Sequence, residues 1–182
     1  MNEPLPTTID LGALTSLFFD DPSRLARFEA VTASAMPEVY RKLLAHEHHM
    51  TVTVEKHHHA PVDVEVLDRR TTPTHYARKI LLRRTSDGRV VQFGIMRVRL
   101  DVFRPPVRDE ILAAETPLGR ILIRHNVFRS IHLSSLWRVV PGDELRDHFG
   151  PGPWLETFGR TALITCDDEP AIELLEIVAP EE

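Results

Sequence analysis

The 182-residue chain has a single cysteine, Cys166, and this scarcity excludes two common ways of stabilising a small protein. One cysteine cannot form an intrachain disulfide, and it cannot build the cysteine-rich clusters that hold structural metal ions. Cys166 also precedes an acidic turn, where a thiolate is disfavoured, so we expect a structural role for it. The fold must therefore depend on its apolar core.

The sequence also lacks a long apolar run and an excess of positive charge. Residues 1–21 contain no Lys or Arg, and their apolar part is far shorter than the roughly 20 residues of a membrane-spanning helix. The chain has 22 Lys and Arg against 27 Asp and Glu, a formal net charge of −5. This balance argues against nucleic acid or a membrane as a partner. We expect a cytoplasmic protein whose partner is a small molecule.

Three familiar site patterns, GxSxG, Walker A and GxGxxG, are missing. Ten histidines suggest metal binding, but neither "HEHHM" nor "HHH" has the HExxH spacing. Consecutive residues in a turn do not readily converge on one ion. The sequence therefore predicts no metal site.

What the chain does have is enough apolar material, 42% of its residues, for one hydrophobic core. It has no internal repeat, low-complexity tract or Gly/Ser linker that would mark a boundary. We expect a single domain over residues 1–182, with flexibility considered for residues 1–20. The oligomeric state is left open.

Helical and strand patterns alternate along the chain. Asp21 and Pro22 form an N-cap and first-turn pair, followed by apolar residues at helical spacing. Strands are indicated by period-two alternation, and the Asp-Gly of "TSDG" indicates a hairpin turn. The predicted helices are 22–33, 37–46, 108–114 and 117–125, with a turn or short helix at 142–149. The predicted strands are 50–55, 62–66, 75–84, 89–103, 136–140, 160–166 and 171–179. The architecture that we predict is α+β, with a six-stranded antiparallel sheet and helices on one face.

The last predicted strand directs a charge toward the core. Side chains alternate across a strand, so Glu176 shares a face with Ile172, Leu174 and Val178. Burying an ionised carboxylate without a partner costs several kcal/mol, on the order of a domain's net stability. The fold must supply either a partner for Glu176 or a use for its charge.

The same argument identifies inward arginines. Arg78 shares a face with Tyr76 and Ile80, and Arg97 and Arg99 share a face with Phe93 and other apolar residues of their strand. Two interpretations stay open: a buried ion pair between Glu176 and Arg78, or a pocket for an anionic ligand. For Arg97 and Arg99 a third is that their long side chains extend to solvent.

The stretch "AETPLGRILIRH" predicts a helix start that attracts anions. Thr116 is a natural N-cap and Pro117 a natural first-turn residue. The amides of Leu118 and Gly119 would then be unpaired donors, which favour carboxylates and phosphates.

In order along the chain, "YARKILL", the "DG" turn, Gly94, "TPLGR" at 116–120 and "LLEIVAP" at 174–180 resemble the chorismate pyruvate-lyase (4-hydroxybenzoate synthase) family. The likeness covers roughly residues 50–180. It implies a six-stranded antiparallel sheet and a lyase that converts chorismate to 4-hydroxybenzoate and pyruvate without a cofactor or metal.

The resemblance also implies site residues. Glu176 matches the catalytic carboxylate, and Arg78 matches an arginine that binds a substrate carboxylate. Leu118 matches a position whose backbone contacts the ligand, with Thr116 and Gly119 beside it. Met36 matches a methionine of the lid. The family's arginine after the strand glycine is replaced here by Ile95, and Arg97 is the residue expected to take over its role.

Two alternatives remain beside the lyase. The same fold serves as the non-catalytic effector-binding domain of GntR-type regulators, although we expect no DNA-reading winged helix before residue 50 of this chain. The other alternative is a biosynthetic enzyme that acts on a different enol-ether or aromatic acid.

Overall fold

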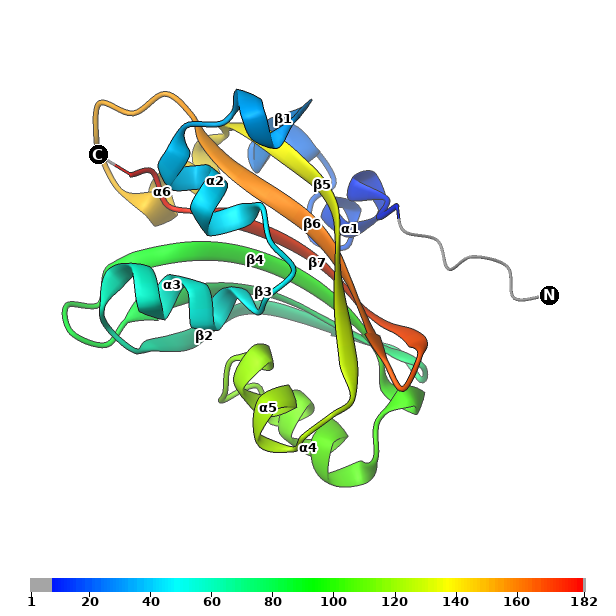
Figure 1. Ribbon diagram of the computed structural model, residues 1–182. Helices are drawn as coiled ribbons and strands as arrows, with labels where there is room; N and C mark the ends of the chain where they lie inside the picture. Colours follow the sequence, from blue (N-terminus) through cyan, green and yellow to red (C-terminus); the bar gives the residue numbers. More distant parts are fainter. Residues whose placement is uncertain (1–7, 182) are drawn as a thin grey trace.

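The computed structural model describes residues 8–181, and its centre is one seven-stranded antiparallel sheet (Figure 1). The strand order is β1-β5-β6-β7-β4-β3-β2, so β1 and β2 are the edge strands. The strands are β1 (Ala26–Val31), β2 (Val62–Thr71), β3 (His75–Arg84), β4 (Val90–Arg99), β5 (Arg129–Pro141), β6 (Thr157–Cys166) and β7 (Glu169–Val178). The α+β class is confirmed, and the sheet has seven strands instead of the predicted six.

Helices cover both faces of this sheet instead of one. They are α1 (Leu11–Ser16), α2 (Glu38–Leu44), α3 (Met50–His58), α4 (Pro105–Ala113), α5 (Leu118–Arg124) and α6 (Asp143–Phe149). Core residues of α2 to α5 pack with Leu174 and Val178 of β7, whereas those of α1 and α6 pack with Leu175 and Ile177. Neighbouring residues of a strand point to opposite faces, so the two groups of helices lie on opposite sides.

Two of the predicted elements are wrong. Residues 50–55 form part of helix α3 instead of a strand, because Met50, Thr51 and Val54 are its buried positions and have helical spacing. Residues 22–33 were expected to be a helix. They form only a 3-10 turn at Pro22–Arg24, followed by the edge strand β1, which pairs with β5. Both cases show pairing and packing overriding a local pattern.

The other predicted strands and helices form, with shifted ends. The β3–β4 hairpin turns at Gly88, whose φ of 72° favours glycine. Within the segment considered for flexibility, residues 11–16 form α1, whereas residues 1–7 lie outside the described part. In the described part of the chain, every helix is too short or too polar to cross a lipid bilayer.

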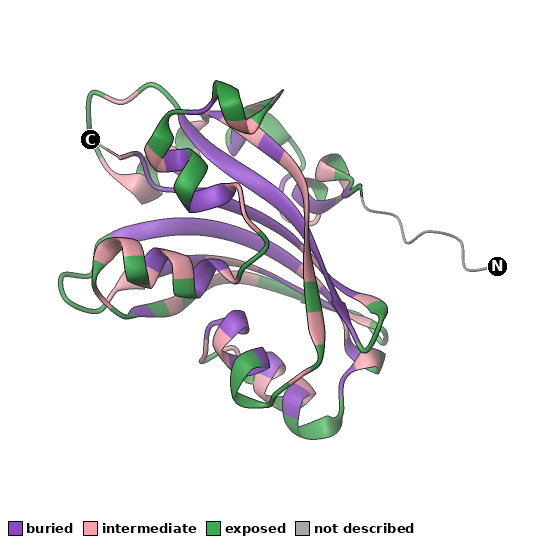
Figure 2. Ribbon diagram, in the orientation of Figure 1, coloured by how far each residue is buried: buried purple, intermediate pink, exposed green. Residues whose placement is uncertain are grey.

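The inner strands are the most buried part of the molecule (Figure 2). Every residue of β6 is buried, and so are most residues of β4 and β7. The core consists of three apolar clusters: one under α4 and α5, one under α2 and α3, and one under α1 and α6. The first two lie on the same face, and the junction between them is where a cavity opens.

We predict that Gly142→Ala destabilises the fold, by about 1–3 kcal/mol of unfolding free energy. A Cβ atom at Gly142 would overlap the carbonyl oxygens of Ser23 and Arg24. Chemical denaturation measures the loss. Gly12→Ala is the control, because Gly12 lies in α1 and its added Cβ would meet only the exposed side chain of Asp10, at 3.3 Å from Oδ1, which can shift; an equal loss in both variants would contradict the prediction.

Candidate ligand-binding site

A cavity lies between β3, β4 and β7 on one side and the first turns of α3 and α5 on the other, and we name it the Arg78 cavity. About 490 Å³ of space that atoms do not fill lies in the cavity and in the open solvent at its mouth. The centre of a water-sized sphere can occupy about 40 Å³ of it. Its wall is formed by His49, Met50, Thr51, Arg78, Ile80, Leu82, Gln92, Gly94, Ile95, Met96, Pro117, Leu118, Gly119, Ile164, Leu174, Leu175 and Glu176.

Strand register places the polar groups of the wall. Gly94 of β4 pairs with Ile80 of β3 on one side and with Glu176 of β7 on the other. A Cβ atom at Gly94 would lie 3.3 Å from a side-chain carbon of Ile80. Glycine therefore leaves room in the floor of the cavity, directly beside the Glu176 carboxylate.

The Arg78 guanidinium is buried without adequate partners. Its exposed fraction is 0%, and its one hydrogen bond is a long donation, 3.4 Å, from Nη2 to the carbonyl oxygen of Thr116. Its Nε and Nη1 have no hydrogen-bond partner among residues 8–181. Burial lowers the pKa of Arg78, and the hydroxyl of Tyr76 opposes that shift. A second wall residue, Gln92, likewise has a buried side-chain oxygen without a partner in the described chain.

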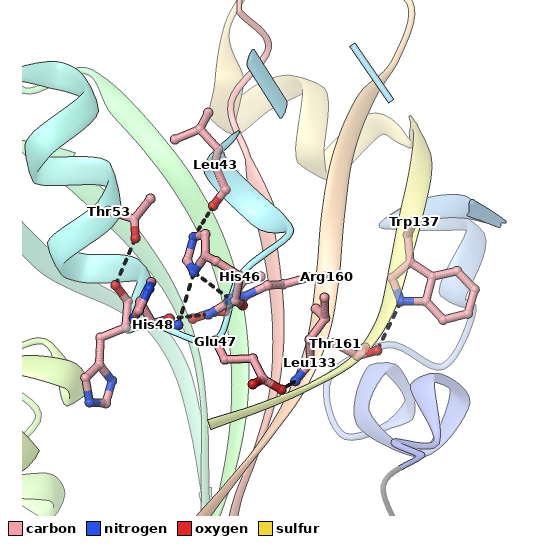
Figure 3. Close-up of polar contacts among 11 residues, drawn as sticks. Leu43, His46, Glu47, His48, Thr53, Leu133, Trp137, Arg160 and Thr161 are labelled. Atoms are coloured by element: carbon pink, nitrogen blue, oxygen red, sulfur yellow. Dashed lines mark hydrogen bonds and ion pairs between the residues drawn. The ribbon is translucent and has the colours of Figure 1, made fainter. Parts of the chain in front are cut away.

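Glu176, in contrast, has a dedicated partner, and it is Arg160 instead of Arg78. The Nε of Arg160 donates to the Glu176 carboxylate at 2.7 Å, and only 1% of the Arg160 side chain is exposed. Arg160 also donates to the carbonyl oxygens of His46 (2.8 Å) and His48 (3.0 Å) (Figure 3). It thereby ties residues 45–49, which we name the α2–α3 loop, to the centre of the sheet.

Two histidines of this loop are held in the neutral form. Burial, with the neighbouring Arg129 and Arg160, lowers the pKa of His49 to about 4. Burial and Arg160 likewise lower the pKa of His46 to about 4. The Nε of Arg129 donates to the Nε2 of His49 at 2.6 Å, which requires a ring nitrogen without a proton. A Cβ at Gly119 would lie 3.1 Å from the His49 Cβ, so the glycine admits this ring.

Four predicted site residues line the cavity: Arg78, Leu118, Gly119 and Glu176. Thr116 contributes its carbonyl oxygen to Arg78, but it is not the N-cap of α5. The N-cap is Pro117, whose backbone is extended.

Arg97 and Met36 were wrongly placed at the site. Arg97 does not line the cavity. It follows Met96, whose side chain packs in the core under α4 and α5, so Arg97 points to the opposite face of the sheet, where it pairs with Glu173 at 2.5 Å. Met36 is buried in the core beside α2. The methionines that do line the cavity are Met50 and Met96.

Sequence reasoning missed Arg160 and the start of α3. Arg160 alternates with Ala162 and Ile164, both buried in one core cluster, so the period-two argument used for Glu176 could have identified it. His49 and Met50 carried no such signal, because their stretch was interpreted as a strand. In the described part of the chain, no three metal-ligating side chains converge in the cavity wall.

Comparison with known proteins finds similar structures but no match by sequence. No protein-family model and no curated protein matches the sequence. The similar solved structures include the following three. PhnF from Mycobacterium smegmatis has a TM-score of 0.52 and 11% identity, over 72% of this chain and 63% of PhnF. The ligand-binding domain assigned to a GntR-family transcriptional regulator from Bordetella bronchiseptica has a TM-score of 0.49 and 13% identity, over 66% of this chain and 87% of that domain. YydK from Bacillus subtilis, a possible transcriptional regulator, has a TM-score of 0.46 and 10% identity, over 64% of this chain and 58% of YydK.

These matches correct the predicted activity. The chain has the chorismate lyase-like fold that GntR-family ligand-binding domains share. The prediction of a chorismate pyruvate-lyase is wrong, because the matched structures are regulator domains and not lyases. This chain spans less than two thirds of the PhnF and YydK structures, and at these identities the likeness concerns the fold alone.

We predict that Arg160 and Glu176 are strongly coupled. Arg160→Met leaves a buried carboxylate unpaired and should cost about 3–5 kcal/mol of unfolding free energy. In the double variant Arg160→Met, Glu176→Gln, the loss of unfolding free energy should be smaller than the sum of the two single losses by at least about 1 kcal/mol. Denaturation of the four proteins gives the coupling. The more exposed pair Arg97 and Glu173, changed in the same way, should couple by less than about 1 kcal/mol.

The pH dependence of stability should report His49. Its folded-state pKa of about 4 is lower than its ordinary value of 6.5. The unfolded chain therefore binds the proton first, and the free energy of unfolding falls as the pH drops from 6.5 to 4. Urea denaturation across this range should show a shallower slope for His49→Gln, and the slope that remains comes from the other groups whose pKa the fold lowers, His46 among them. The exposed His59, changed to Asn, should keep the parent slope; equal slopes for His49→Gln and the parent would refute the assignment.

Proposed function

We propose that this chain is a non-catalytic binding domain for a small organic anion and that Arg78 is the main partner of the anion. The observation that carries the proposal is the buried guanidinium of Arg78, with two nitrogens that have no partner among residues 8–181, in the wall of a cavity. A carboxylate would accept two parallel hydrogen bonds from such a group.

The energetics favour a ligand over a purely structural role for Arg78. A buried charge without partners costs several kcal/mol, and an apolar residue of similar volume would avoid that cost. Arg160 shows that this fold can satisfy a buried guanidinium fully when the role is structural. Arg78 is left incomplete, as expected of a group whose partner arrives from solution.

The other residues of the cavity wall indicate which uncharged groups the anionic ligand carries. Ile80, Leu82, Met96 and Leu174 offer an apolar surface to a ring or an aliphatic body. The unpaired oxygen of Gln92 would accept a hydrogen bond from a hydroxyl or amine group of the ligand. The free space of the closed cavity suits a few waters, since about 10–15 Å³ suffices for one. A larger ligand therefore requires the wall to move.

A binding role without catalysis is the alternative that the fold supports. Glu176, the carboxylate expected to act as acid or base, has an arginine partner. The chorismate lyase-like fold is shared with domains that bind ligands in regulators. We propose no lyase activity for this chain.

Replacing Arg78 by Met should separate binding from folding. The variant removes an unpaired buried charge, so the free energy of unfolding of the ligand-free protein should stay the same or increase. Affinity for a bound organic anion should fall by at least about tenfold, because a charge-assisted hydrogen bond contributes about 1.5–3 kcal/mol. The probes are benzoate, 4-hydroxybenzoate and inorganic phosphate, measured by isothermal titration calorimetry and thermal shift.

Arg97→Met is the matched control, because Arg97 lies on the neighbouring strand and faces away from the cavity. It should keep the affinity of the parent protein and lose at most about 1 kcal/mol of stability. Unchanged anion affinity in Arg78→Met, or a large loss of stability in the ligand-free variant, would contradict the proposed function.

A further inference from the structure

Two histidines and a carboxylate meet at the far end of α3 from the Arg78 cavity. His57 and His58 end this helix, and Glu181 comes from the last described residues of the chain. The Nε2 of His57 lies 3.1 Å from one oxygen of Glu181, and the Nε2 of His58 lies 3.8 Å from the other. One ligand atom from each residue can be chosen so that all three lie within 4.8 Å of one another.

These separations suit a transition-metal ion. Zn²⁺ binds histidine nitrogen and carboxylate oxygen at about 2.0–2.2 Å, so the ligand atoms of a tetrahedral site lie about 3.4 Å apart. The two nitrogen–oxygen distances, 3.1 and 3.8 Å, lie on either side of this separation. Consecutive histidines were expected not to converge, but the two rings stand edge to face, 4.7 Å apart, and the Glu181 carboxylate reaches both. The side chains are 31%, 13% and 21% exposed, so an ion and one water could reach them.

The carboxylate is held in place by its backbone. The amide of Glu181 donates to the hydroxyl of Tyr40 at 2.8 Å, and the Tyr40 ring packs on Phe158 with centroids 4.6 Å apart. Two residues earlier, the amide of Ala179 donates to the carbonyl oxygen of Val91 at 2.9 Å. Preorganised ligands lose less conformational freedom when an ion binds.

Charge around the cluster acts in both directions. The Glu181 carboxylate attracts a cation, whereas Arg84 and Arg89 lie close enough to the His58 ring to act on its charge. The same arginines repel a cation, and the Glu181 carboxylate compensates for one of them. Because these charges give a cation little net attraction, the ion must form strong bonds to the histidine nitrogens. Mg²⁺ and Ca²⁺ prefer oxygen ligands and are therefore excluded.

We propose that His57, His58 and Glu181 form a site for Zn²⁺ or a similar divalent transition-metal ion. The site is separate from the Arg78 cavity and does not depend on the proposed function. The bound ion joins Glu181 to α3, which begins at Met50 of the cavity wall, directly after His49.

The test is isothermal titration calorimetry of the chain, purified without a histidine tag, with ZnCl₂. We expect saturable binding of one ion per chain and an increase in the thermal unfolding midpoint when Zn²⁺ is present. His57→Ala, His58→Ala and Glu181→Gln should each weaken Zn²⁺ binding by at least about tenfold. MgCl₂ should give no saturable binding.

His59→Asn is the matched control, because His59 follows directly in the sequence, is exposed and has a φ of 50°, which asparagine tolerates. This variant and Arg78→Met should both keep the parent affinity for Zn²⁺. The proposal is overturned if the parent binds no Zn²⁺ saturably, or if the three ligand variants bind as tightly as the parent, since the ion would then be held by other histidines.

Discussion

The buried guanidinium of Arg160 is the interaction on which the arrangement of the cavity depends. It neutralises Glu176 on the adjacent strand and donates to the carbonyl oxygens of His46 and His48. Because these bonds use most of its donors, the desolvation cost of the two charges is largely offset. The same bonds position the α2–α3 loop, and this loop leads directly into the turn of α3 that covers the cavity.

Two buried arginines on one face of the sheet therefore have opposite roles. Within the described part of the chain, every guanidinium nitrogen of Arg160 has a hydrogen-bond partner, whereas two of the three nitrogens of Arg78 have none. The contrast fits the occurrence of a pattern typical of a lyase in a chain that we propose to be a binding domain. Glu176 occupies the expected position on β7, but its charge is already paired with Arg160, so that position alone does not define a reaction.

Period-two patterning predicted most of the sheet correctly, and its failures have a physical explanation. The hairpins β3–β4 and β6–β7 combine apolar alternation with turn residues, so local and tertiary preferences agree. In residues 50–55 the alternating Thr and Val satisfy a strand pattern equally well, but the packing of Val54 against the core selects a helix. In β1, pairing with β5 outweighs the helical spacing that follows Pro22.

The sequence by itself determined that Arg78 and Glu176 point inward on their strands, since alternation is a property of the backbone. Only the tertiary structure decided that Glu176 pairs with Arg160, that Arg78 lacks a complete set of partners among residues 8–181, and that Glu181 meets His57 and His58. Such pairings depend on strand order and on the path of loops between distant segments, and local sequence patterns carry no information about either.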